Sequence, residues 1–161
     1  MTRDELERFA AGLAADTPRW QPFLAAAADE DERVYELIWD DETANAWVIR
    51  WSDDSDTGFH DHDESAAAIT VVSGHVREDR LTLGGAGGGS ISRELGPGDT
   101  FTVEPVAIHR VLHAGAGPAV TIHAYSPPLR RTGAYTVLPS GELARESHPF
   151  EVELRAETAL A

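Results

Sequence analysis

The sequence predicts an all-β protein of the double-sheet, jelly-roll barrel type, with two N-terminal helices packed outside the barrel. Short segments rich in Val, Ile, Trp, Thr and Tyr recur after residue 33, and clusters of Gly, Pro, Asp and Ser separate them. The 161 residues suit one domain with one core. We therefore expect a single domain over residues 1–161, with a helical segment in 1–28, the barrel in 33–138 and a C-terminal strap in 139–161.

Two helix starts precede the barrel. Thr2 and Glu5 have the spacing of a capping box, and apolar residues follow at helical spacing. Thr17 followed by Pro18 marks a second start, because proline is favoured in the first turn of a helix. The acidic run 29–32 then ends the helical segment and is interpreted as a solvated junction.

Nine short strands are expected to form the barrel. A glycine-rich run at 84–89 should connect two of them as a hairpin loop, and it does not resemble a phosphate-binding loop because no Lys follows it. A strand or strap around Phe150, Val152 and Leu154 should follow within 143–161. The strands are expected at about 33–39, 45–51, 67–73, 75–83, 90–95, 100–103, 108–114, 119–125 and 134–138.

The charge balance argues against several classes of partner. The chain has 28 acidic residues against 13 basic ones and a net charge of −15, which disfavours binding to nucleic acid or to anionic membranes. No stretch approaches the roughly 20 apolar residues of a membrane span, and residues 1–15 lack the apolar core of a signal peptide. We expect a cytoplasmic monomer. Because the chain has no Cys, a metal ion would need His, Asp or Glu ligands.

Histidines carry the clearest chemical signal. His60 and His62 form an H-x-H pair, and alternate residues of a strand face the same side, so both imidazoles can enter one barrel interior. His109 begins another expected strand, and His123 lies in a third. Imidazole suits Fe, Zn, Cu and Ni, so a cluster of three histidines is a credible transition-metal site.

These histidines lie in segments that resemble the two motifs of the cupin superfamily, whose fold is a double-stranded β-helix. The first motif is matched by Gly58-x-His60-x-His62 with Gly74 after it, and a shortened second motif by Gly98 and then Pro105-x-Ala107-x-His109. Cupins usually carry a Glu ligand between the H-x-H pair and the following Gly, but Ala67 stands at that position here.

The missing acid points to one branch of that superfamily. Together with the segments FHDH (59–62), IHRV (108–111) and TIHAYSPP (121–128), it makes the region of about residues 33–128 resemble the cysteine dioxygenase family. Two departures stand out. The chain has no Cys for the thioether link that animal members make to their active-site Tyr, and His113 replaces an Asn usual in the family.

The resemblance implies specific roles for individual residues. It implies one Fe(II) per chain, with Tyr125 as the active-site tyrosine, His123 as the residue that orients it, and Thr121 in the place of a family Ser. The implied iron ligands are His60, His62 and His109.

Substrate recognition is less clear from the sequence. Cysteine-specific members of the family carry Tyr-x-Arg on an early strand, whereas this chain has the reversed pair Arg33-x-Tyr35. Period-two alternation still places both on one face, and the planar fork of Arg33 could bind a substrate carboxylate. The alternative is an ordinary exposed Arg at a strand start. Arg130 and Arg131 follow a Pro-Pro pair and are candidates for the pocket mouth or the surface.

The leading functional hypothesis is an Fe(II)-dependent thiol dioxygenase that uses O₂ to oxidise a small thiol to its sulfinic acid. Cysteine, 3-mercaptopropionate, cysteamine and ergothioneine all remain open as substrates. One alternative is another three-His cupin enzyme, either a carbon–carbon-cleaving dioxygenase or an isomerase, which would not need Thr121, His123 and Tyr125. The other is a non-enzymatic ligand-binding cupin.

Overall fold

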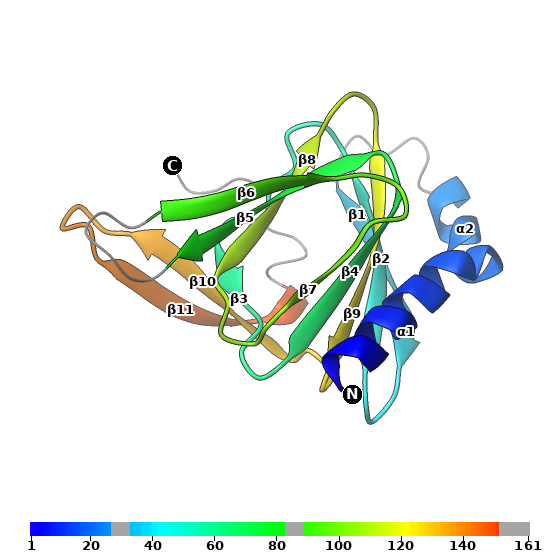
Figure 1. The fold of residues 1–161 in the computed structure, drawn as a ribbon, viewed down its shortest axis with the longest axis horizontal. Coiled ribbons are helices and arrows are strands. Elements are labelled where there is room, and N and C mark those ends of the chain that lie inside the picture. The colour runs from blue at the N-terminus through cyan, green and yellow to red at the C-terminus, as the bar shows by residue number, and fades with distance from the viewer. Residues whose placement is uncertain (27–32, 83–88, 152–161) are drawn as a thin grey trace.

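Two facing antiparallel β-sheets form the centre of the computed structural model, which describes residues 1–26, 33–82 and 89–151 (Figure 1). The strand orders are β1-β2-β9-β4-β7 in the five-stranded sheet and β11-β10-β3-β8-β5-β6 in the six-stranded sheet. Every paired strand is antiparallel to its neighbour. The structure confirms the predicted all-β barrel of the double-stranded β-helix type.

The five-stranded sheet consists of β1 (Val34–Asp40), β2 (Asn45–Trp51), β9 (Ala119–Ser126), β4 (Ala66–Ser73) and β7 (Thr100–Val103). The six-stranded sheet consists of β11 (Leu143–Pro149), β10 (Arg131–Val137), β3 (His60–Asp61), β8 (His109–Ala114), β5 (His75–Thr82) and β6 (Gly89–Leu95).

Both predicted helices are present and lie against the outer side of the five-stranded sheet (Figure 1). Helix α1 (Arg3–Ala15) begins with the expected capping box, in which the Thr2 hydroxyl accepts from the Glu5 N–H and the Glu5 carboxylate accepts from the Thr2 N–H. Helix α2 (Thr17–Ala26) follows directly. No helix within the described ranges is long and apolar enough to cross a membrane.

Strict alternation along β2 and β9 creates two apolar layers. Trp47, Ile49 and Trp51 point between the sheets, whereas Ala46 and Val48 point toward the helices. Strand β9 alternates in the same way and is therefore buried along its whole length. Strands β2 and β9 are thus covered on both faces, and the inward face of β9 carries the polar side chains described below.

Details of the prediction differ from the structure at the second sheet. The histidine pair lies at a strand of two residues, β3, and His62 falls just beyond its end. Strand β10 begins at Arg131, earlier than expected. The C-terminal strand β11 ends at Pro149, so Phe150, around which a strand was expected, lies just beyond it. The antiparallel pairing of β5 with β6 agrees with a hairpin. The acidic run 29–32, most of the glycine-rich loop, Val152 and Leu154 lie outside the described residues.

Candidate metal centre

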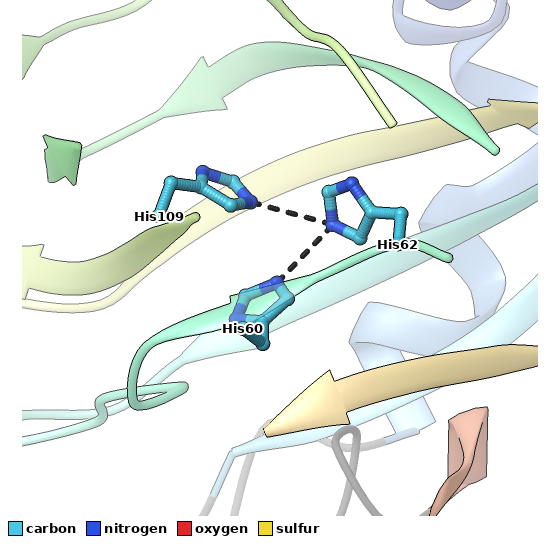
Figure 2. Close-up of side chains that lie close together, drawn as sticks. All are labelled: His60, His62 and His109. Atoms are coloured by element: carbon cyan, nitrogen blue, oxygen red, sulfur yellow. Dashed lines mark hydrogen bonds between the residues drawn. The ribbon is translucent and has the colours of Figure 1, made fainter. Parts of the chain in front are cut away.

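Three buried histidines converge at one point between the sheets (Figure 2). His60 Nε2 lies 3.1 Å from His62 Nε2, and His109 Nε2 lies 3.3 Å from the same atom. One nitrogen from each ring lies within 4.8 Å of the others, and the three residues are 3%, 1% and 0% exposed, in chain order. The predicted ligand residues therefore form one compact cluster.

Strand pairing explains why the rings meet. His60 on β3 is the direct cross-strand neighbour of His109 on β8, so their side chains share the inward face. His62 follows two residues after His60 and points to the same side, because side chains alternate along an extended chain. The intervening Asp61 consequently points outward.

The hydrogen bonds of the outer ring nitrogens set the tautomers of two of these rings. His60 Nδ1–H donates to the carbonyl of Gly58 at 3.0 Å, since a carbonyl can only accept. His109 Nδ1–H donates to the Glu78 carboxylate at 3.1 Å. The Nε2 atoms of His60 and His109 therefore present lone pairs toward His62 Nε2. A single N–H at His62 Nε2 would have to be shared between these two acceptors. A cation at the cluster would satisfy all three rings, so the donor set fits a metal ion.

Burial keeps the His109 imidazole neutral. It lowers the pKa of His109 well below the usual value, and the neighbouring His60 adds to the effect. Metal ions bind the neutral imidazole, so at neutral pH no proton needs to leave His109 before a metal binds.

Glu78 is a buried partner that the sequence analysis missed. It lies on β5, is 2% exposed, and accepts from His109 at one oxygen. Arg80 donates to that same oxygen at 2.8 Å and Arg93 donates to the other at 2.7 Å. The available signal was the alternation of Val76, Glu78 and Arg80, which places an acid among inward-facing residues.

Within the described ranges, the three histidines are the only group of His, Cys, Asp or Glu residues with this close spacing. Asp61 lies between the ligands in sequence but faces outward, where Arg145 and Tyr135 bind it. Glu64 is exposed, and Ala67 is fully buried at the position where cupins usually carry a Glu. The donor set consists of three imidazoles.

Besides the three histidines, a hydrogen-bonded chain of polar side chains runs along the inward face of β9. His123 Nε2 lies 2.9 Å from the Thr121 hydroxyl, and His123 Nδ1 lies 3.2 Å from the Tyr125 hydroxyl. Trp51 Nε1–H donates to the Thr121 oxygen at 2.8 Å. The Tyr125 ring then meets the His62 ring at 5.1 Å in an edge-on contact. Thr121, His123 and Tyr125 therefore form a continuous chain that ends beside the three histidines.

Thr121, His123 and Tyr125 are as deeply buried as the three clustered histidines. Tyr125 is 1% exposed, and burial lowers the pKa of His123 to about 3, so its imidazole is neutral at physiological pH. A neutral imidazole has one N–H and one lone pair, so His123 can accept a hydrogen bond from one neighbour while donating one to the other.

The predicted substrate-binding pair lies at the far end of this chain. Tyr35 packs against the core between the sheets, and the Arg33 guanidinium lies 5.4 Å from the centre of the Trp51 ring. Arg130 and Arg131 are exposed and line, together with His62, an open hollow of about 290 Å³. Arg33 is thus linked to Tyr125 through Trp51 and Thr121, while Arg130 and Arg131 lie on the side of His62.

His113, the residue that departs from the family pattern, lies away from the cluster. It is four residues beyond His109 on β8, and its Nε2–H donates to the carbonyl of Gly117 at 2.6 Å. Its Nδ1 lies 3.7 Å from a carboxylate oxygen of Asp53. His113 therefore closes a turn instead of orienting His109.

A family comparison agrees with these residues. The family described as cysteine dioxygenase type I matches residues 2–137, which include all three histidines and the chain that ends at Tyr125. Germin-like protein 4-1 from Oryza sativa subsp. japonica is 38% identical over 69 residues, which span 42% of this chain and 27% of that relative.

Solved structures share the fold at low sequence identity. KdgF from Halomonas sp. superposes with a TM-score of 0.52 at 17% identity, covering 62% of this chain and 82% of that protein. A protein with a double-stranded β-helix domain from Klebsiella pneumoniae subsp. pneumoniae gives 0.51 at 17% identity, covering 73% and 86%. At this identity the likeness concerns the fold alone.

Proposed function

The chain belongs to the cysteine dioxygenase type I family, and on that premise we propose that it is an Fe(II)-dependent thiol dioxygenase. The reaction is RSH + O₂ → RSO₂H, in which the sulfur is oxidised, both oxygen atoms end on sulfur, and no other co-reactant is consumed. One observation carries the proposal: three buried imidazoles converge without a carboxylate, and a buried tyrosine lies directly beside them.

In this proposal His60, His62 and His109 hold one iron per chain. When bound, a ferrous ion provides open positions for a thiolate and for O₂, together with the redox chemistry that joins them. Three neutral ligands leave the positive charge of the ion uncompensated, which favours an anionic sulfur at the site. A single chain provides all three ligands.

Tyr125 has the role of hydrogen-bond donor to the reacting atoms. Trp51 donates to Thr121, and we assign the Thr121 proton to His123 Nε2, which leaves His123 Nδ1–H to donate to the tyrosine oxygen. The phenolic proton of Tyr125 is then directed away from His123 and is available to the oxygen or sulfur that reacts. His123 and Thr121 therefore act as positioning residues for that proton.

Arg33 and Tyr35 are proposed to recognise the substrate. Tyr35 packs at the inner core and Arg33 lies over Trp51, next to the chain that leads to Tyr125. A guanidinium fork suits a carboxylate, so this assignment favours a thiol that carries a carboxyl group over cysteamine.

The test is anaerobic reconstitution with Fe(II), followed by oxygen uptake with cysteine, 3-mercaptopropionate, cysteamine and ergothioneine. We expect one O₂ consumed for each thiol and a sulfinate product by mass spectrometry. An iron-loaded protein that oxidises none of these thiols but cleaves a carbon–carbon bond or isomerises its substrate would contradict the proposal. Binding of a small molecule without any turnover would contradict it in favour of a non-enzymatic cupin.

A further inference from the structure

The strand that carries His60, and that ends just before His62, is unusually short. β3 contains only His60 and Asp61, and its ladder pairs them with Ala134 and Gly133 on β10 and pairs His60 with His109 on β8. A two-residue strand has few backbone hydrogen bonds with which to fix its position. Interactions outside the ladder are therefore needed to hold these ligands at a constant spacing.

Asp61 provides such interactions on the outer face of the sheet. Arg145 of β11 donates to both carboxylate oxygens at 2.8 Å, a bidentate geometry that fixes direction as well as distance. The Tyr135 hydroxyl of β10 donates to the same carboxylate at 2.6 Å. The Asp61 side chain is 8% exposed and that of Arg145 is 35% exposed, so the ion pair is only partly hydrated.

The same carboxylate also orders the turn after His62. Asp61 accepts from the Asp63 N–H at 2.9 Å, and Asp63 adopts a φ of 56°, in the left-handed region. The Ser65 N–H then donates to the His62 carbonyl at 3.0 Å and closes the turn. Asp61 therefore restrains the backbone on both sides of His62.

Gly133 leaves room for this arrangement. It lies opposite Asp61 on β10, and a Cβ at this position would collide with the Arg145 guanidinium. The Asp61 carboxylate thereby accepts hydrogen bonds from Arg145, from Tyr135 and from the backbone of Asp63 at the same time.

We propose that Asp61, Tyr135 and Arg145 form a clamp that positions the metal ligands from outside the barrel. This Asp61 clamp acts through alternation: His60 and His62 face inward while the residue between them is held outward, so fixing Asp61 fixes the separation of both rings. The inference rests on the metal centre of the proposed function. It assigns a role in metal binding to the C-terminal hairpin β10–β11.

The decisive experiment measures the affinity of the folded apoprotein for Co(II), by anaerobic competition with a chelator. Loss of partners that orient ligands typically costs about 10- to 100-fold in metal affinity, and we expect that loss for Arg145→Met together with an altered Co(II) absorption spectrum. Arg77→Met is the matched control, because Arg77 also makes a bidentate ion pair with an aspartate of the six-stranded sheet, Asp79, without touching Asp61. Its affinity should stay within about twofold of the wild type.

Tyr135→Phe keeps the proposal testable if Arg145→Met does not fold. It removes a single hydroxyl, and we expect an affinity about three- to tenfold lower. Wild-type affinity in Tyr135→Phe and in any folded Arg145→Met would overturn the clamp. A wild type that binds no Co(II) would overturn both the clamp and the metal centre. If affinity falls as expected but the iron-loaded wild type oxidises no thiol, the clamp stands and the proposed activity is wrong.

Discussion

The two sheets hold their functional side chains by different means. In the five-stranded sheet, β9 is buried along its entire length, between the helices on one face and the barrel core on the other, and Thr121, His123 and Tyr125 are fixed by that packing. In the six-stranded sheet, β3 has only two residues, and the ligands depend on charged partners such as Glu78 and Asp61.

Because of this difference, substitutions in the two sheets should impair different properties, metal binding in one case and turnover in the other. Polar partners of the ligands can be removed without opening the apolar layer between the helices and β9, so such changes should act on the metal site first. Changes to the polar chain on β9 should leave the ligands in place and act on turnover. Each prediction below tests one side of that division.

The largest effect is expected from removing a ligand. His109→Ala should abolish metal binding and thiol oxidation, because only two imidazoles remain to hold the ion. The far-UV circular dichroism spectrum should keep the strand content of the wild type. The metal content of the purified variant decides the outcome. His113→Ala on the same strand is the control and should retain iron; equal metal content in the two variants would refute the assignment.

Tyr125→Phe should have the next largest effect, and it should spare the metal. Loss of a positioned proton donor typically slows a reaction by about 100- to 10,000-fold. We therefore expect near-normal iron content with a strongly reduced kcat for thiol oxidation. If the variant forms sulfinate at the wild-type rate, Tyr125 only packs in the core, and the metal site remains without the proposed proton donor.

Glu78→Gln tests the charged support of His109. The amide is a weaker acceptor for the His109 N–H and leaves Arg80 and Arg93 without their carboxylate, so metal affinity should fall by about 10- to 100-fold. Asp79→Asn is the matched control, because Asp79 pairs with Arg77 and Arg110 on the opposite face of β5. Chelator competition distinguishes them, and a similar loss in both variants would indicate general weakening of the sheet.

The smallest effect is expected for Thr121→Val. The change removes the hydroxyl that joins Trp51 to His123 while keeping a similar volume. One hydrogen bond is worth about 1 kcal/mol, which corresponds to a roughly fivefold loss in kcat at unchanged iron content. Thr121→Ser should restore the rate, and failure of this rescue would show that the hydroxyl is not the important group.

The sequence alone could predict one half of this comparison better than the other. Alternation placed Thr121, His123 and Tyr125 on one face, and their hydrogen bonds link neighbours two residues apart. The supports of the ligands were not predicted, because Glu78 meets His109 across 31 residues and Arg145 meets Asp61 across 84. The two-residue length of β3 depends on β8 and β10, which are far away in sequence.

The central claim is that this centre places both atoms of O₂ on a thiol sulfur. Oxidation of cysteine and of 3-mercaptopropionate under ¹⁸O₂ by the iron-loaded protein, with mass spectrometry of the product, tests it most directly. We predict a sulfinate in which both sulfur-bound oxygens carry the label and no release of hydrogen peroxide. A product with one labelled oxygen, or a disulfide accompanied by peroxide, would contradict the account.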